Sequence, residues 1–415
     1  MASHHSSFVG SFVGRSGLEL QQSKTDEGLP LRDAEAGTMS TAATTMNLVT
    51  TMIGAGVLAL PKVYATVGIP VGVVVTAIGC SISVYLCDIL SEAIGQVQKR
   101  TKTRMRTVED VGFACYGDLG RRAARLVING TFIGKTAVYF VLIGQNLAFL
   151  RSPPMYRGWV VLGSSVFMSL AFVRNVSTLE KIAFLGVVCS VIYLCMIIFG
   201  SAQARVAGLS EGTDFIKLRD LDRFQILPAL SVMLFSFGPT DVLGTVRNNM
   251  ANQQGMRLSI VASHAAVGFF CAVAGALGFW GFGAEVQDDI TQSMCGELLD
   301  GKCVAGTKWI SGYLLAGAVV LNLGVSIPID LYCLFSNIEA SYPAEAPMPA
   351  SMNVALRLAV VLFCAVVGLA LPFFMEVLEI FCALLIVPGV IWLPLIFARK
   401  AAIDSGISRS FMVRL

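Results

Sequence analysis

The sequence predicts an all-α, polytopic membrane protein with about ten transmembrane helices. Of its 415 residues, 55% are hydrophobic and 14% are charged, whereas about 25% of residues are charged in an ordinary soluble domain. Apolar runs of roughly twenty residues recur along the chain and are continuous rather than alternating, which favours helices over the strands of a β-barrel.

The predicted spans are each long enough to cross about 30 Å of hydrocarbon as a helix. They lie at about 42–62, 69–92, 126–149, 157–173, 182–203, 226–246, 259–282, 309–334, 353–371 and 375–398. Residues 1–40 have no apolar core of signal-peptide length and are rich in Ser, Gly and charge, so they predict a disordered cytoplasmic tail. The transporter-like membrane domain is expected over residues 41–398, with a short cytoplasmic tail at 399–415.

The distribution of charge predicts the orientation of the chain. The connection between the second and third spans holds a cluster of bases: Lys99, Arg100, Lys102, Arg104, Arg106, Arg121, Arg122 and Arg125. The positive-inside rule places such a connection in the cytoplasm, and counting spans from it places both termini there as well. The connection at 284–308 is acidic and is assigned to the outside, whereas the charges of 204–223 balance each other.

Most cysteines lie within apolar spans, where they are interpreted as small core residues. Cys295 and Cys303 differ because both lie in the connection assigned to the outside, eight positions apart. A disulfide between them is a hypothesis that depends on an oxidising compartment on that side.

Two of the predicted helices contain residues that interrupt a helix at membrane depth. The first span carries Gly54-Ala55-Gly56, and the sixth carries Gly238-Pro239. Corresponding breaks in two five-helix halves, 41–203 and 224–398, are the pattern of inverted repeats. In such repeats half-helix N-termini face an anionic group and exposed carbonyls hold a cation. The alternative is that these residues serve only packing and kinking.

Ionisable residues within spans are expensive to insert and invite functional hypotheses. They are Lys135, Asp241, His264, Asp330 and Glu379. Asp241, beside the second break, is suited to accept a proton, to pair with an amine, or to cap the second half-helix. Lys135 is expected to neutralise Asp241 or Asp330. The ion pair would serve either ion-coupled transport or only the stability of the bundle. For His264, a satisfied interior histidine is favoured over a proton relay.

Several motifs resemble those of the amino acid/auxin permease family, which includes vesicular, proton-coupled and sodium-coupled amino acid transporters. The first-helix motif is Asn47-Leu48-Val49 followed by Ile53-Gly54-Ala55-Gly56-Val57-Leu58-Ala59-Leu60-Pro61. Shorter matches follow in order at 139–147, at Phe235-Ser236-Phe237, at Ser326-Ile327-Pro328, at Val387-Pro388-Gly389 and at Leu393-Pro394. The resemblance covers about residues 40–398.

The resemblance implies a LeuT-type fold of 5+5 inverted repeats with alternating access and an amino acid bound between spans one, three, six and eight. The expected substrate-binding residues are Thr51, Ile53, Gly54, Ala55, Gly56, Tyr139, Phe235, Phe237, Gly238 and Thr240. The expected ion-coupling residues, which include the two intramembrane carboxylates, are Asn47, Thr50, Asp241, Ser326 and Asp330.

Two departures from the family pattern limit what it implies. Many members have an eleventh helix, whereas only 401–415 follow the last predicted span here. Sodium-coupled relatives have an Asn at the position of Thr50. Loss of this amide weakens the case for sodium, and the sequence gives proton coupling at least equal weight.

Other function classes are disfavoured by what the sequence lacks. It has no nucleotide-binding signature. It also has no pairing of a nucleophile with a base, and no spacing of metal ligands, that is typical of an enzyme. We predict secondary active transport of amino acids, and no enzyme activity, cofactor, resident metal or nucleic-acid partner. A non-transporting amino acid sensor and a transporter of another carboxylate solute stay open. So do the oligomeric state and the choice between the plasma membrane and a vacuolar or lysosomal-type membrane.

Overall fold

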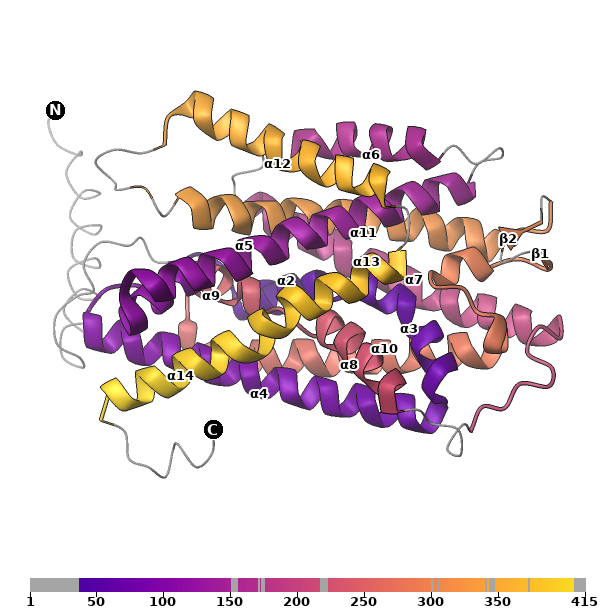
Figure 1. Cartoon of the computed structure of the whole chain (residues 1–415), viewed down its shortest axis with the longest axis horizontal. Helices are drawn as coiled ribbons and strands as arrows, with labels where there is room; N and C mark the ends of the chain where they lie inside the picture. Colours follow the sequence, from indigo (N-terminus) through magenta and orange to yellow (C-terminus); the bar gives the residue numbers. More distant parts are fainter. Residues whose placement is uncertain are drawn as a thin grey trace, which may run out of the picture.

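The computed structural model describes residues 37–150, 156–170, 172, 176–216, 223–299, 302–304, 306–339, 342, 348–371 and 374–406. Most of the predicted N-terminal tail, and the end of the C-terminal tail from residue 407, therefore lie outside the described residues. Within them the chain is a bundle of long helices that run roughly parallel to one another (Figure 1).

In the described part of the chain, the first half of the bundle contains six helices. They are α2 (Thr41–Met52), α3 (Ala55–Val67), α4 (Ile69–Thr101), α5 (Val108–Leu150), α6 (Tyr156–Leu170) and α7 (Val176–Val206). The described residues of the second half form seven, which are α8 (Arg223–Ser236), α9 (Thr240–Asn249), α10 (Met256–Phe282), α11 (Ile310–Glu339), α12 (Ala350–Ala370), α13 (Phe374–Phe381) and α14 (Leu393–Asp404).

Short elements join the helices of the second half. The 3₁₀ turns are η1 (Gln253–Gly255), η2 (Gly283–Glu285) and η3 (Ile290–Ser293), and the strands are β1 (Leu298–Leu299) and β2 (Lys302–Cys303). Two π-helical turns, η4 (Cys382–Ile386) and η5 (Pro388–Trp392), lie between α13 and α14. π-Helical turns of this kind are rare and occur often at functional sites.

Nine of the ten predicted spans are found as helical runs of membrane-crossing length. Among the described residues, 8 helical runs are long and apolar enough to cross a membrane, and the bent pair α2 and α3 makes a ninth. The remaining predicted span, 157–173, is α6, which has 15 residues. The all-α polytopic prediction is confirmed. The last span is longer than expected, because α14 continues to Asp404 and so includes the first residues assigned to the tail.

Helix α5 begins well before the predicted third span. Its first part is separated from the span by non-helical backbone at Tyr116 and Gly117, where Gly117 has a φ of 61°. The two limbs of this kink touch at Gly112 and Gly120, since a Cβ atom on Gly112 would lie 2.6 Å from the carbonyl oxygen of Gly120. Glycine at these positions lets the chain fold back on itself at the end of the bundle.

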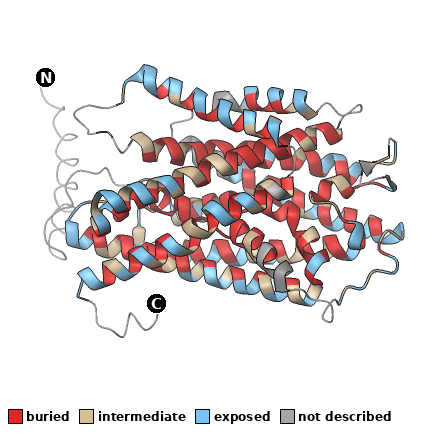
Figure 2. Cartoon of the chain, viewed as in Figure 1, coloured by how far each residue is buried: buried red, intermediate tan, exposed pale blue. Residues whose placement is uncertain are grey.

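The helices that carry the breaks lie at the centre of the bundle. Within Ala229–Asn249, 89% of an apolar 18-residue window is buried in the protein, compared with 33% of such a window in Ala350–Ala370. Helix α11 packs along α5 and α7, and buried residues follow the inner faces of these helices (Figure 2). Helix α12 therefore lies at the periphery, and its exposed Leu362, Phe363 and Val366 suit a lipid environment.

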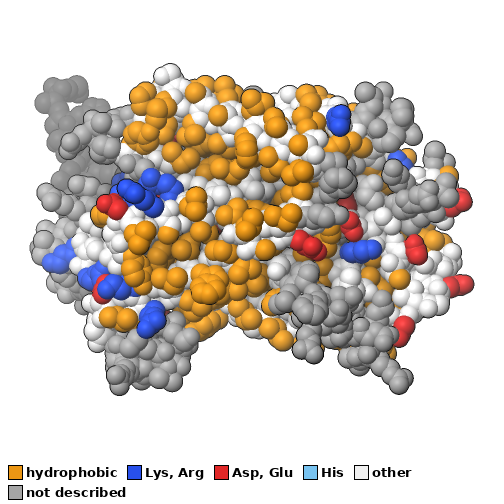
Figure 3. All heavy atoms as spheres, in the orientation of Figure 1, with side chains coloured by type: hydrophobic (Ala, Val, Ile, Leu, Met, Phe, Trp, Pro, Cys, Tyr) orange, Lys and Arg blue, Asp and Glu red, His pale blue; other side chains and the backbone are white. Residues whose placement is uncertain are grey.

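The surface has the pattern of an integral membrane protein. Hydrophobic side chains cover the middle of the bundle, Lys and Arg gather at one end, and Asp and Glu are more frequent at the other (Figure 3). The basic end is where α4 and α14 finish, and Arg100 there forms an ion pair with Asp404. The β1 and β2 hairpin lies at the opposite end (Figure 1), so the described chain has a basic end and an acidic end, as predicted.

The connection at the acidic end is tied to the bundle. Cys295 and Cys303 form a disulfide with their Cα atoms 5.8 Å apart. Asp289 caps η3 and accepts a hydrogen bond of 2.9 Å from the side chain of Asn146 on α5. Burial raises the pKa of Asp289 to about 6.

Maleimide labelling of the denatured protein tests the disulfide. Only free thiols react with a maleimide polymer, so reduction should add two adducts to the wild type. It should add none to the Cys295→Ser/Cys303→Ser variant. Cys195→Ser removes an exposed free thiol and should leave the reduction-dependent shift intact. A wild type whose mobility does not change on reduction would contradict the bond.

Candidate functional site

The first break separates α2 from α3 and bends the span by 53°. The amide of Ile53 still bonds to the carbonyl of Val49 at 2.9 Å, and Gly54 then leaves helical geometry with φ −140° and ψ −139°. Gly54 is the N-cap of α3 and contributes no side-chain hydrogen bond. The first amides of a helix have no acceptor one turn earlier. Here the amide of Val57 bonds to the carbonyl of Gly54 at 3.3 Å, and Ala55 and Gly56 before it are buried.

Both glycines of this break lie where another helix approaches closely. A Cβ atom on Gly54 would be 2.9 Å from the hydroxyl oxygen of Tyr139 on α5. A Cβ atom on Gly56 would be 2.8 Å from the ring of Phe235 and would also meet Ser236, both on α8. Real Cβ atoms almost never come so close, so glycine is what allows the first and sixth spans to touch at their breaks.

The second break separates α8 from α9 at Phe237, Gly238 and Pro239. Pro239 is the N-cap of α9 and contributes no side-chain cap. A Cβ atom on Gly238 would lie 2.8 Å from the carbonyl oxygen of Leu234 and 2.7 Å from Val390 on η5. Thr240 donates a hydrogen bond of 3.4 Å to the carbonyl of Gly389 on η5, so the break of span six rests on the π-helical part of the last span.

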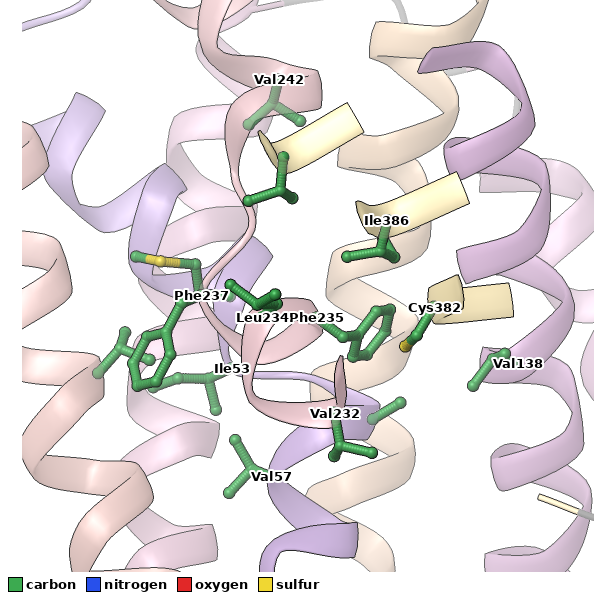
Figure 4. Packing of buried hydrophobic residues seen from close by; sticks show 14 of the residues in the cluster. Ile53, Val57, Val138, Val232, Leu234, Phe235, Phe237, Val242, Cys382 and Ile386 are labelled. Atoms are coloured by element: carbon green, nitrogen blue, oxygen red, sulfur yellow. The ribbon is translucent and has the colours of Figure 1, made fainter. Parts of the chain in front are cut away.

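The two phenylalanines of span six point to opposite sides of the chain (Figure 4). The ring of Phe235 makes an edge contact with Phe381, with centroids 5.9 Å apart, and faces Cys382 and Ile386 of the last span (Figure 4). The ring of Phe237 is fully buried on the other side, within about 4 Å of the sites where Cβ atoms on Gly79 and Gly268 would lie. Of the two, only Phe235 borders Gly56.

A hydroxyl group of the eighth span contacts the backbone of the first span. Ser326 on α11 donates to the carbonyl of Thr50 at 3.3 Å and to that of Asn322 at 3.1 Å. Thr51 donates to the carbonyl of Asn47 at 2.8 Å, within its own helix. The structure therefore brings Thr50 and Ser326 together, whereas Asn47 lies a turn away, where its amide approaches the sulfur of Met39 at 3.8 Å.

The intramembrane charges form a second group. The ammonium of Lys135 on α5 lies 2.7 Å from the carboxylate of Asp241 on α9, and both side chains are buried. Asp241 also accepts a hydrogen bond of 3.0 Å from the amide of Val242. The N-cap of α9 is Pro239, so the prediction that Asp241 is the N-cap is wrong. Asp241 instead lies within the first turn of α9. Removing one partner of a buried pair costs about 3–5 kcal/mol.

The sequence did not single out Ser83 on α4, which the structure places at the second break. Its hydroxyl donates to the carbonyl of Phe237 and lies 3.1 Å from a ring nitrogen of His264. The other ring nitrogen of His264 lies 2.8 Å from the carbonyl of Ile260. His264 is thus satisfied within the protein, as predicted. A single serine in an apolar span gives no sequence signal for such a contact.

The comparison with protein families agrees with this arrangement. The family model described as transmembrane amino acid transporter protein matches residues 37–413. The chain belongs to this family. The resemblance inferred from the first-helix motif is therefore confirmed, and the family and its members found here are transporters rather than enzymes.

Known relatives are distant in sequence. The chain is similar to Amino acid transporter ANT1 of Arabidopsis thaliana, with 21% identity over 66% of this chain and 66% of the relative. It is also similar to the Vesicular GABA transporter of Caenorhabditis elegans, with 21% identity over 75% of this chain and 64% of the relative. The matches span slightly less than two thirds of the length of each relative.

A solved structure identifies the fold. The crystal structure of MhsT in complex with L-phenylalanine matches with a TM-score of 0.58 and 13% identity, over 91% of this chain and 94% of that one. The predicted LeuT-type fold is confirmed by this likeness.

The contact between the breaks predicts the effect of a single methyl group. Gly56→Ala should lower amino acid uptake by about tenfold, because the overpacking cost of about 1–3 kcal/mol falls on the contact with Phe235 and Ser236. Uptake of radiolabelled L-amino acids into proteoliposomes measures it. The control is Gly317→Ala on α11, where a Cβ atom meets nothing within 4 Å. Equal losses in both variants, or none in Gly56→Ala, would contradict the assignment.

Proposed function

We propose that this protein transports amino acids across a membrane by alternating access, driven by a proton or sodium gradient. The observation that carries the proposal is the direct contact between two helix breaks at the centre of the bundle, with Tyr139 against Gly54. Irregular backbone at membrane depth occurs only where it is buried in protein or lines a cavity. In this family it is the expected place for a substrate.

The first amides of α3 suit the carboxylate of an amino acid. They combine N–H groups that lack a helical acceptor with the positive end of a helix dipole. In this conformation Tyr139, Phe235 and Ser236 occupy the space beside Gly54 and Gly56, so these side chains have to move before a carboxylate reaches the backbone. Ile53 and Phe235 supply apolar surface for a substrate side chain, because both border the break and are buried. The residues proposed for the substrate therefore divide between polar backbone and apolar side chains.

Coupling requires a group whose charge or ligand changes between the two sides of the membrane. The contact between Thr50 and Ser326 and the charged group around Asp241 are the two candidates. A sodium ion would be held by carbonyl and hydroxyl oxygens at the first, whereas a proton would bind a carboxylate at the second. The amino acid and the lipid bilayer are the proposed partners.

The basic end of the bundle is proposed to face the cytoplasm. It holds Lys99, Arg100 and Arg104, and the ends of α4 and α14 meet there through Arg100 and Asp404. Basic connections are retained on the cytoplasmic side during insertion. The disulfide at the opposite end then faces the exterior or an organelle lumen, where disulfides persist.

Reconstitution tests the function and its driving ion. We expect purified protein in proteoliposomes to accumulate at least one radiolabelled L-amino acid when a proton or sodium gradient is imposed alone. Protein-free liposomes with the same gradients are the control, and unlabelled amino acid should compete. Binding of amino acids without movement under either gradient would favour the sensor, and absence of both binding and transport would overturn the proposal.

A further inference from the structure

Three charged side chains in the interior of the bundle interact with one another and with Tyr139 of the proposed substrate site. Lys135 lies on α5, Asp241 in the first turn of α9 and Asp330 on α11. Their exposures are 2%, 3% and 1%. Asp330 interacts electrostatically with both other charges, and Lys135 interacts with both carboxylates. The three therefore form one electrostatic unit built from three separate helices.

The two carboxylates of this unit differ in their partners. Asp241 receives the ammonium of Lys135 at 2.7 Å on one oxygen and the amide of Val242 at 3.0 Å on the other. Among the described residues, neither oxygen of Asp330 has a hydrogen-bond partner. A buried carboxylate without a donor is unfavourable when ionised, because its hydration is lost and nothing replaces it.

A count of charges also shows that two ionised carboxylates are unfavourable in this unit. With both carboxylates ionised, one lysine faces two aspartates, and the unit has a net charge of −1 in an apolar interior. Tyr139 on α5, Cys333 on α11 and Cys87 on α4 also interact with these charges. Phenols and thiols are neutral near pH 7, because their ordinary pKa values lie above it. The described neighbours therefore do not supply the missing positive charge.

We propose that Asp330 is the binding site of the coupling proton and that Lys135 exchanges Asp241 for Asp330 when this proton leaves. This inference rests on the transport function proposed above and names its driving ion. A proton on Asp330 brings the unit to neutrality and leaves the observed pair of Lys135 and Asp241 in place. A sodium ion fits less well, because it requires several oxygen ligands and Asp330 already interacts with the positive charge of Lys135.

The step is a proton transfer from the carboxyl of Asp330 to water on the side that the site faces. The carboxylate that remains attracts the ammonium of Lys135, whose long and flexible side chain bears three donors. Asp241 then loses its partner on α5. Because Asp241 lies in the first turn after the second break, the loss frees the start of α9 from α5 and couples the proton to the movement of the break.

The variant Asp330→Asn isolates the role of the proton. Asparagine is neutral and similar in shape to the protonated acid, so the pair of Lys135 and Asp241 should persist. With a gradient of one pH unit, we expect the wild type to accumulate amino acid by up to about tenfold per proton. Asp330→Asn should only equalise the two sides, and its uptake should no longer depend on pH.

The matched control is the same substitution at another buried acid. Asp289→Asn changes a buried carboxylate in the connection before η3, away from the charged unit, and should retain accumulation. Exchange of labelled for unlabelled amino acid, measured without any gradient, separates this proposal from the transport function. If the wild type neither exchanges nor accumulates amino acids, the transport function fails.

A second measurement does not depend on transport. Dicyclohexylcarbodiimide adds to protonated carboxyl groups in apolar surroundings, and mass spectrometry of the purified wild type then locates the adduct. We expect the adduct on Asp330 and not on Asp241, with less labelling as pH rises. An adduct on Asp241 instead, proton-driven accumulation in Asp330→Asn, or a sodium dependence that Asp330→Asn removes would each overturn the proposal.

Discussion

The structure depends on the direct contact between the interrupted first and sixth spans. Backbone amides and carbonyls that lose their helical partners at membrane depth cost several kcal/mol each unless the protein surrounds them. Gly56 against Phe235 and Ser236 brings the two breaks together, and Ser83 supplies a donor to the freed carbonyl of Phe237. Each interruption is thus tolerable only because other helices cover it.

This constraint explains why the fold was largely predictable from the sequence. Continuous apolar runs give the spans, and Gly54, Gly56 and Pro239 mark the breaks because no regular helix accommodates them well. The kink at Gly117 was missed, because a glycine near the end of a helix can also terminate it. The length of the last span was underestimated because Lys400 and Asp404 suggested solvent, whereas they pair with each other at 2.8 Å at the helix end.

The site was predictable only in part, because its contacts join residues far apart in the chain. Lys135 and Asp241 are separated by 106 positions, so the sequence could suggest that they pair but could not choose between Asp241 and Asp330. The family motif treats Phe235 and Phe237 alike, but positions two apart do not share a face of a helix. Their side chains accordingly point to opposite sides (Figure 4), and only the packing of the other spans shows that Phe235 is the one that borders the first break.

The two groups proposed for ion coupling are linked through α11. Ser326 and Asp330 are four residues apart on this helix and therefore lie on the same face, one turn from each other. Ser326 contacts α2 just before the first break, and Asp330 interacts with Asp241 just after the second. A shift of α11 relative to these spans would change both contacts together. Opening of the substrate site and exchange of the lysine partner would then be two consequences of one movement, which is what tight coupling requires.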